Sequence, residues 1–311
     1  MAKITIIGAG NVGATAAHLL ALKNLADIVL VDVVEGLPQG KALDILESGP
    51  IEGFDHKIIG TNNYEDTNDS DIIVITAGIA RKPGMTREDL LKTNASIVKG
   101  VVESAVKYSP NAILIVVTNP LDAMVYLAAK VSNFSKNKVI GMAGVLDTTR
   151  FKTFIAEELN INAKKIEAVV LGSHGDDMVP LISKTTVDGK PITDLLPAEK
   201  INKLVERTRN GGIEIINLLK TGSAYYAPVS SIVEMIDAIL NDKKKLLPCA
   251  AYCGKEYGVG GYFIGVPAVL GRNGVEKIVE FDLDENEKMQ FEKTVEHVKE
   301  LCAEVDKLLT T

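Results

Sequence analysis

The first half of the chain alternates short apolar runs with longer stretches in which apolar residues recur at helical spacing. The apolar runs read KITIIG, DIVLVD, DIIVITAG, AILIVVTNP and KVIGMAG, and amphipathic stretches such as VGATAAHLLALKN and NASIVKGVVESAVKYS separate them. Strands that are apolar along their whole length are buried on both faces, as in a parallel sheet between two layers of helices. We therefore expect residues 1–144 to form a doubly wound α/β domain.

Residues 145–311 do not keep this alternation. The stretch SKTTVDGKPI predicts a hairpin that turns at Asp188-Gly189. Helices are expected near residues 198–220 and 225–241, followed by a glycine-rich β region. A last helix begins after Asp284, which has Glu287 three residues on, the pattern of a capped helix start. We expect a mixed α+β domain packed against the first.

A glycine-rich turn follows the first predicted strand. In ITIIGAGNVG, Gly8, Gly10 and Gly13 have the GxGxxG spacing, and a helix-forming stretch follows. Such glycines form the turn, let the backbone approach a pyrophosphate and let helix and strand pack closely. Asp32 ends the second strand, where a carboxylate accepts hydrogen bonds from ribose hydroxyls. The motif predicts a Rossmann domain, and the charge of Asp32 favours NAD over NADP because it would repel a 2′-phosphate.

The composition excludes several classes of partner. The chain has 311 residues, 46% of them hydrophobic and 24% charged, and a formal net charge of −7. This charge gives no electrostatic footprint for nucleic acid or for an anionic membrane. No apolar run is long enough to span a bilayer, and no secretory leader precedes the first strand, so we expect a cytoplasmic protein. Cys249, Cys253 and Cys302 are expected to be reduced thiols.

Polar side chains follow several of the predicted strands. The loop GIARKPGMTREDL after the fourth strand carries Arg81 and Arg87, and VVTNPLD ends another strand at Asn119. Loops after the carboxyl ends of parallel strands face the ligand crevice. VLDTTRF spaces Asp147 and Arg150 three residues apart, which on a helix places carboxylate and guanidinium on one side. These positions are candidates for binding a ligand.

His174, in LGSHGDDMVP, could belong to a serine triad, a metal site, a proton relay or an ordinary turn. A serine triad is excluded because Ser173 is its immediate neighbour at a strand end, where adjacent side chains point apart, and the chain has no GxSxG turn. A metal site is also excluded, since none of the four histidines has zinc-type spacing with another histidine or with a cysteine. His18 is expected in the core, and His56 and His297 on the surface. A proton relay and an ordinary turn stay open for His174.

The motifs GAGNVG, ITAG, RKPGMTR, TNPLD, LDTTRF and GSHGD occur in this order, and with them the chain resembles the lactate/malate dehydrogenase family from its first strand to its last helix. The resemblance implies hydride transfer between a 2-hydroxy acid and NAD. It makes His174 the acid/base, oriented by Asp147, while Arg150 binds the C1 carboxylate. Arg87 would polarise the C2 oxygen from a closing loop, and Asn119 would bind and orient substrate.

The resemblance also implies which residues contact NAD. They are Gly8, Gly10, Asn11, Val12, Gly13, Asp32, Ala77, Gly78, Asn94, Val117, Thr118 and Asn119. Members of the family are dimers or tetramers, so we expect a homodimer or a homotetramer, with GLPQGKALDILES as a candidate interface.

Arg81 distinguishes between the hydroxy acids. Lactate-type members carry an uncharged residue at this position, and malate-type members carry arginine. Two carboxylates can be met by three arginines, whereas pyruvate would leave one guanidinium unpaired at a cost of about 3 to 5 kcal/mol. The position therefore favours malate and oxaloacetate. Ser223, where lactate-type members have threonine, leaves room for the longer acid.

Two other functions remain possible at this point. A lactate-type 2-keto acid reductase would differ by preferring pyruvate. A noncatalytic dinucleotide-binding protein is permitted by the fold alone, but it does not require a set of arginines, an aspartate and a histidine in these positions.

Overall fold

The computed structural model describes residues 1–80 and 84–310. Its strands in the first half are β1 (Lys3–Ile7), β2 (Asp27–Val31), β3 (Ile58–Thr61), β4 (Ile72–Ile75), β5 (Ile113–Val116) and β6 (Val139–Gly141). These strands pair in parallel in the order β3-β2-β1-β4-β5-β6. This is the predicted doubly wound arrangement.

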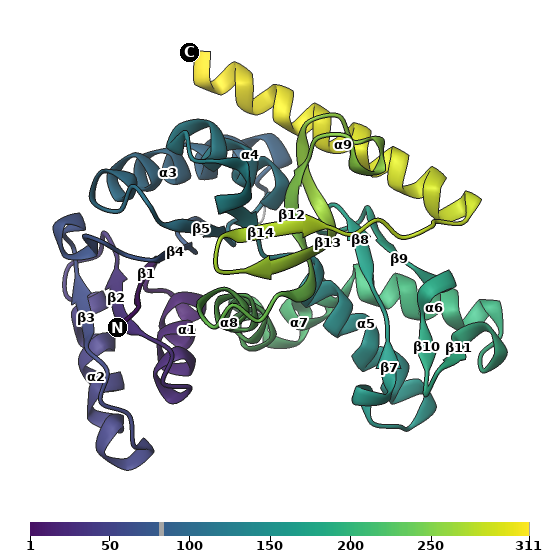
Figure 1. Cartoon of the computed structure of the whole chain (residues 1–311), viewed down its shortest axis with the longest axis horizontal. Helices are drawn as coiled ribbons and strands as arrows, with labels where there is room; N and C mark the ends of the chain where they lie inside the picture. Colours follow the sequence, from purple (N-terminus) through teal and green to yellow (C-terminus); the bar gives the residue numbers. More distant parts are fainter. Residues whose placement is uncertain (81–83, 311) are drawn as a thin grey trace.

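Helices connect these strands and cover both faces of the sheet (Figure 1). They are α1 (Asn11–Leu22), α2 (Leu37–Glu52), α3 (Arg87–Tyr108) and α4 (Leu121–Ser132). Alternate residues of a strand enter different cores: Ile72 and Val74 pack in the cluster that includes α1, whereas Ile73 and Ile75 pack in the cluster that includes α3 and α4. Burial on both faces explains why the strands are apolar throughout.

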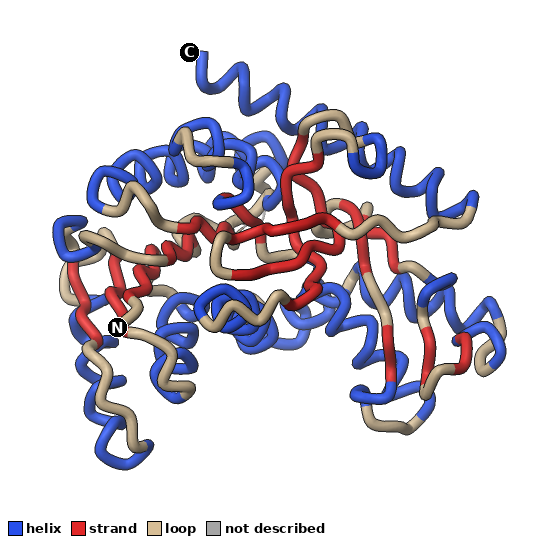
Figure 2. Tube along the Cα trace, in the orientation of Figure 1, coloured by secondary structure: helices blue, strands red, loops and turns tan. Residues whose placement is uncertain are grey.

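The second half extends the same sheet with antiparallel strands. These are β12 (Lys245–Cys253), β13 (Tyr262–Gly271), β14 (Gly274–Ile278), β8 (Val170–Gly172) and β9 (Met178–Pro180). They continue from β6 in the order β12-β13-β8-β9, and β14 pairs with β13. A separate small sheet contains β7 (Ile166–Glu167), β10 (Thr186–Val187) and β11 (Lys190–Pro191), and Asp188-Gly189 joins the last two as predicted. Figure 2 shows the strands of the large sheet and of the small one in red.

The helices of the second half are α5 (Gly144–Leu159), α6 (Ala198–Arg209), α7 (Gly211–Leu219), α8 (Tyr226–Leu240) and α9 (Glu285–Thr310). The single helix predicted near 198–220 is divided at Asn210, whose backbone (φ −91°, ψ 1°) leaves the helical region. At the start of α9, Asp284 Oδ1 accepts the N–H of Glu287 at 2.8 Å and Glu287 Oε2 accepts the N–H of Asp284 at 3.1 Å, which confirms the predicted cap.

The last helix runs along one side of the molecule and contacts both halves of the chain (Figure 1). It packs on α3 and α4 of the first half and on β8, β9 and β13 of the second. In the described part of the chain, no helix is long and apolar enough to cross a membrane.

Candidate active site

The glycine turn between β1 and α1 has the geometry that its sequence requires. Gly8 has a φ of +109°, in the region that favours glycine. A Cβ on Gly13 would lie 1.8 Å from the carbonyl oxygen of Gly8, so only glycine lets the helix approach the strand this closely. A Cβ on Gly10 would meet nothing within 4 Å in the described protein. Packing therefore does not demand glycine at position 10, but the approach of a ligand would.

Asp32 lies directly against this turn at the carboxyl end of β2. Its Oδ2 accepts the N–H of Ala9 at 2.6 Å, and its Oδ1 accepts the N–H of Val34 at 3.0 Å. The two bonds fix the carboxylate beside the glycine turn. Each oxygen keeps a second lone pair with which to accept a ribose hydroxyl.

The strand ends next to the turn are joined by Asn94 of α3. This side chain is fully buried; its Oδ1 accepts the N–H of Ile79 at 2.8 Å, and its Nδ2 donates to the carbonyl of Asn119 at 2.7 Å. Thr118 Oγ1 donates to the carbonyl of Ala77 at 2.7 Å. The loops after β4 and β5 are thus tied together, and a contact of Asn94 with the cofactor remains a prediction. The other predicted cofactor residues, Asn11, Val12, Gly78 and Val117, lie at the same edge of the sheet.

A cavity of about 600 Å³ lies between the two halves of the chain. Three of the predicted substrate-binding residues, Arg87, Asn119 and Arg150, line it together with the predicted catalytic residue His174. Ser223 lies in the segment between α7 and α8 and is not among the lining residues, so its contact with substrate remains a prediction. Arg81 lies outside the described residues.

His174 and Arg150 line this cavity, and both contact the buried Asp147, which is not a lining residue. His174 Nδ1 lies 2.8 Å from Asp147 Oδ2, and Arg150 Nη1 lies 3.6 Å from Asp147 Oδ1. The Asp147 side chain is 2% exposed and that of His174 is 17% exposed. Because Nδ1 is bonded to the aspartate, Nε2 is the ring nitrogen left for a ligand. The expectation that Asp147 and Arg150 lie on one side of a helix is confirmed.

The charges of this group determine its protonation. Burial alone would lower the pKa of His174, but the charge and the hydrogen bond of Asp147 outweigh burial and raise that pKa above 6.5. Burial lowers the pKa of Arg150, and the charge of Asp147 offsets part of this effect. Arginine nevertheless stays charged. Arg150 Nε is buried and has no hydrogen-bond partner among the described residues. The site therefore presents a proton donor beside a cation with unused donors.

Arg87 is the first residue of α3, whose start is capped by Thr86 and Asp89. Its guanidinium is 69% exposed and pairs with Asp176 at 3.0 Å. Asp176 lies two residues beyond His174, so Arg87 reaches the rim of the cavity rather than its interior. In this arrangement the predicted carbonyl-polarising residue contacts another protein carboxylate.

Asp122, in the first turn of α4, is a cavity residue that the sequence analysis missed. Its side chain is buried; Oδ2 accepts the Ser173 hydroxyl at 2.7 Å and the N–H of His174 at 3.3 Å. Burial raises the pKa of this carboxyl, although the bonds from Ser173 and His174 and the charge of His174 oppose the rise. A carboxylate inside the otherwise apolar motif NPLDAMV was the signal that could have identified it.

The expectation that His56 lies on the surface was wrong. His56 is buried, with 7% of its surface exposed, because it packs against Met1 and Asp27 at the start of β1 and β2. His297, whose side chain is 32% exposed, lines the cavity and lies 2.6 Å from Asp177, a contact that the sequence analysis did not predict. Both contacts join segments distant in sequence. In residues 1–80 and 84–310, no group of three or more His, Cys, Asp or Glu side chains could hold a metal ion.

A glycine turn of the dinucleotide-binding type, and a histidine–aspartate–arginine group at a cavity between the two halves of the chain, are features of an α/β oxidoreductase with a dinucleotide-binding domain. Residues 2–141 match the family model of the lactate/malate dehydrogenase NAD binding domain, and residues 144–309 match that of the lactate/malate dehydrogenase alpha/beta C-terminal domain. The chain belongs to the lactate/malate dehydrogenase family. The division at residue 144 stays a prediction.

Individual relatives agree with this membership. The chain is 58% identical over 308 residues to a malate dehydrogenase of Chloroherpeton thalassium, with 99% of each covered. Its structure is similar to apo malate dehydrogenase of Picrophilus torridus (TM-score 0.97, 50% identity, covering 99% of this chain and 98% of that one). It is also similar to Cryptosporidium parvum lactate dehydrogenase complexed with lactic acid and nicotinamide adenine dinucleotide (TM-score 0.95, 45% identity, 98% of each).

Proposed function

We propose that this protein catalyses reversible hydride transfer between (S)-malate and NAD⁺, which yields oxaloacetate, NADH and a proton. The observation that carries the proposal is the pairing of His174 with buried Asp147, next to Arg150, in a cavity that reaches the end of β5 at Asn119. An imidazole with one nitrogen fixed and the other free is suited to exchange a proton with a bound hydroxyl.

His174 acts on the C2 hydroxyl. During malate oxidation, neutral Nε2 accepts the hydroxyl proton while the C2–H bond breaks and the C2 carbonyl forms. During reduction, protonated Nε2 returns that proton to the C2 oxygen. Asp147 holds the ring in one orientation and stabilises the imidazolium, as the raised pKa of His174 indicates.

The cations hold the substrate against this histidine. Arg150, with a buried and unpaired Nε, binds the C1 carboxylate through two parallel hydrogen bonds. Arg87 leaves Asp176 and polarises the C2 oxygen when substrate is bound. Asn119, at the cavity wall, bonds the substrate and orients it. Fixing two reactants in this way supplies much of the rate enhancement in such a transfer.

The glycine turn fits a nicotinamide dinucleotide. Open space beside Gly10 admits the pyrophosphate, and Asp32 accepts the ribose hydroxyls. A 2′-phosphate would meet the same carboxylate, which favours NAD over NADP. The bound dinucleotide supplies the hydride acceptor or donor at its nicotinamide ring.

Arg81 supports malate over lactate, because its guanidinium can pair with the second carboxylate of malate, which lactate lacks. The rival is a lactate-type reductase, which the likeness to the Cryptosporidium parvum lactate dehydrogenase favours. A homodimer or homotetramer and a cytoplasmic location are part of the proposal and rest on the sequence alone.

The test is NADH oxidation by the purified protein with oxaloacetate, pyruvate and 2-ketoisocaproate side by side. We expect kcat/KM for oxaloacetate to exceed that for pyruvate by a factor of hundreds, and Arg81→Gln to reduce this ratio. A preference of the wild-type protein for pyruvate would refute the malate proposal. An unchanged ratio in Arg81→Gln would show that this arginine does not read the second carboxylate.

A further inference from the structure

The catalytic histidine lies on a short turn, residues 173–177, between β8 and β9. We call this segment the catalytic turn. Gly175 at its centre has a φ of +127° and carries no side chain that could fix it. The orientation of His174 therefore depends on how the residues on either side of Gly175 are held.

On the near side of Gly175, the catalytic turn is bonded to buried groups. Ser173 Oγ donates to Asp122 of α4 at 2.7 Å, and the Ser173 N–H donates to the Thr294 hydroxyl of α9 at 3.1 Å. Thr294 is fully buried. This side of the turn is thus fixed to two helices.

On the far side, the catalytic turn is bonded to α9 again. His297 Nδ1 lies 2.6 Å from Asp177 Oδ2, and the two side chains are 32% and 28% exposed. Thr294 and His297 are three residues apart, so they lie on the same face of α9. This face therefore contacts the catalytic turn on both sides of His174.

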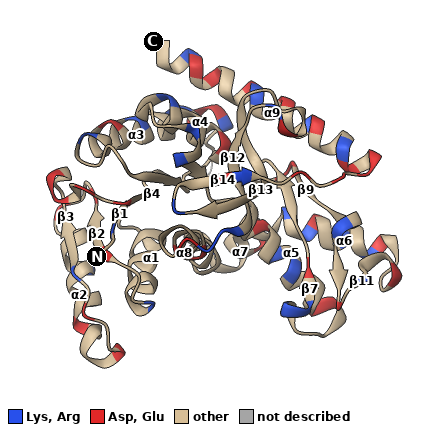
Figure 3. Ribbon diagram, in the orientation of Figure 1, with Lys and Arg blue, Asp and Glu red and all other residues tan. Residues whose placement is uncertain are grey.

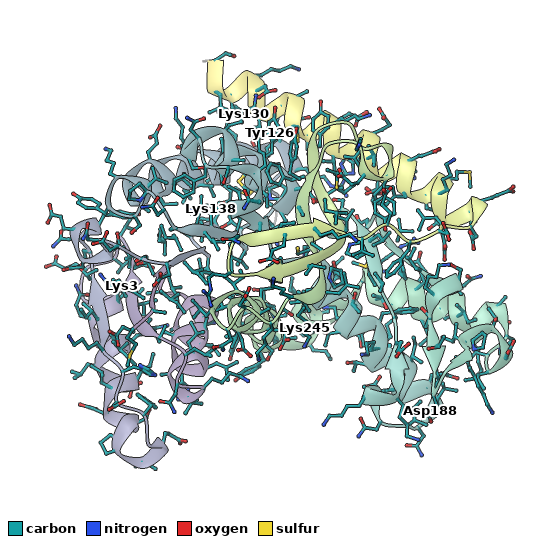
Figure 4. The ribbon with its side chains drawn as sticks, viewed as in Figure 1. Lys3, Tyr126, Lys130, Lys138, Asp188 and Lys245 are labelled. Atoms are coloured by element: carbon teal, nitrogen blue, oxygen red, sulfur yellow. The ribbon has the colours of Figure 1, made fainter. Side chains whose placement is uncertain are left out.

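The helix that makes these contacts is itself anchored at both ends. Near its start, Glu287 is buried and accepts hydrogen bonds from the backbone and hydroxyl of Ser183 at 2.9 and 2.8 Å. Near its end, Asp306 accepts the Tyr126 hydroxyl of α4 at 2.9 Å and lies 3.4 Å from Lys130. Figure 4 labels Tyr126 and Lys130 beneath this end of the helix. A helix held at two ends is a rigid support for a turn.

We propose that His297 is a positioning residue: acting through Asp177, it holds the far side of the catalytic turn and so keeps His174 aligned with the substrate. The inference rests on the proposed acid/base role of His174. Without this contact the far side of the turn loses its bond to α9, and the imidazole spends less time in the reactive orientation. The effect falls on kcat, because the dinucleotide turn lies on other elements.

The test compares variants at the two positions. We expect His297→Ala and Asp177→Ala each to lower kcat for oxaloacetate reduction about 10-fold. A 10-fold change corresponds to about 1.4 kcal/mol, which is close to the smallest contribution expected of a hydrogen bond to a charged group. The double variant should lose no more than either single variant, because both remove the same contact. KM for NADH should not change.

His297→Asn is the rescue variant, because its amide nitrogen reaches the position of Nδ1 and can donate to Asp177; most of kcat should return. Glu296→Ala is the matched control, since this neighbour on α9 pairs with Lys299 at the surface. Thermal unfolding of each variant shows whether the fold survives. If His297→Ala does not fold, Asp177→Ala removes the same contact from the other partner and supplies the comparison.

An unchanged kcat in His297→Ala, or losses that add in the double variant, would overturn the inference. His174→Asn measured beside them separates this outcome from failure of the proposed function. If His174→Asn abolishes turnover while His297→Ala leaves it intact, only the positioning role is lost. If His174→Asn retains wild-type turnover, the proposed function itself is wrong.

Discussion

Asp147→Asn tests the charge relation on which the proposed proton transfer depends. The substitution keeps the size of the side chain and removes the charge that raises the pKa of His174. The pair is joined at 2.8 Å, and both side chains are largely buried, so solvent screens it little. A charge-assisted hydrogen bond of this kind contributes roughly 1.5–3 kcal/mol, which corresponds to about a 10- to 150-fold change in the protonation equilibrium.

The direction of the pH shift depends on which protonation state of His174 the reaction requires. Oxaloacetate reduction requires the imidazolium, and its kcat/KM falls as pH rises through the pKa of His174. With that pKa lowered, the alkaline limb of the profile moves to lower pH, and the rate at a fixed alkaline pH falls about 10- to 150-fold. Part of the rate should return on acidification.

The assay is the pH profile of kcat/KM for oxaloacetate, with NADH affinity measured by fluorescence titration at each pH. Glu158→Gln is the matched control, because this residue of α5 pairs with Lys200 away from the cavity. An Asp147→Asn profile with its alkaline limb unmoved would refute the electrostatic reasoning. A uniform loss at all pH values would assign Asp147 an orienting role alone.

Three further predictions concern the binding elements. Gly13→Ala should weaken NADH binding about 10-fold in a fluorescence titration, because its Cβ would lie 1.8 Å from the Gly8 carbonyl oxygen and the turn must shift, whereas Gly100→Ala, where the space is open, should not. Asp32→Ala should narrow the preference for NADH over NADPH by roughly 10- to 100-fold in kcat/KM, and an unchanged preference would mean that another residue excludes the 2′-phosphate. Arg150→Lys should raise KM for oxaloacetate about 10-fold or more with NADH affinity intact, since lysine cannot form two parallel bonds; an unaltered KM would place the C1 carboxylate elsewhere.

The features that the sequence predicted correctly are local ones. The strands around Ile72 and Ile113 were recognisable because burial on both faces leaves no polar positions. The Asp188-Gly189 turn and the cap at Asp284 were recognisable because turn and cap residues act on their immediate neighbours. The contact between Asp147 and Arg150 followed from helical spacing.

The features that the sequence did not predict depend on contacts between distant segments. His56 is buried because it packs against Met1 and Asp27, which lie 55 and 29 positions away in the sequence. His297 meets Asp177 across 120 positions of sequence, and no local pattern indicates which acid a helix will reach. The break at Asn210 is an exception, because Asn210-Gly211-Gly212 is a local signal for a helix end that the sequence analysis did not use. The hydrogen bonds of Asn94 were also not predicted, because they reach two loops, at Ile79 and Asn119, that are distant from it in sequence.

Charged side chains of both signs lie on the surface helices (Figure 3). Figure 3 shows lysines, arginines and acidic residues interspersed along the surface helices, including α9. Many of them pair with each other, as Arg207 does with Glu157 and Glu214 at 2.7 and 2.9 Å. Among the predicted substrate cations, Arg150 is distinguished by its burial and by its contact with Asp147, the partner of His174, not by a general excess of positive charge.

The central claim, that His174 transfers the proton, is tested most directly by His174→Asn. Turnover of oxaloacetate and the dissociation constant for NADH are measured on the same preparation. We expect turnover to fall by several orders of magnitude while the dissociation constant for NADH stays within a factor of about two, because the dinucleotide turn and Asp32 lie on separate elements. Retention of turnover, or loss of NADH binding in a folded protein, would contradict this account.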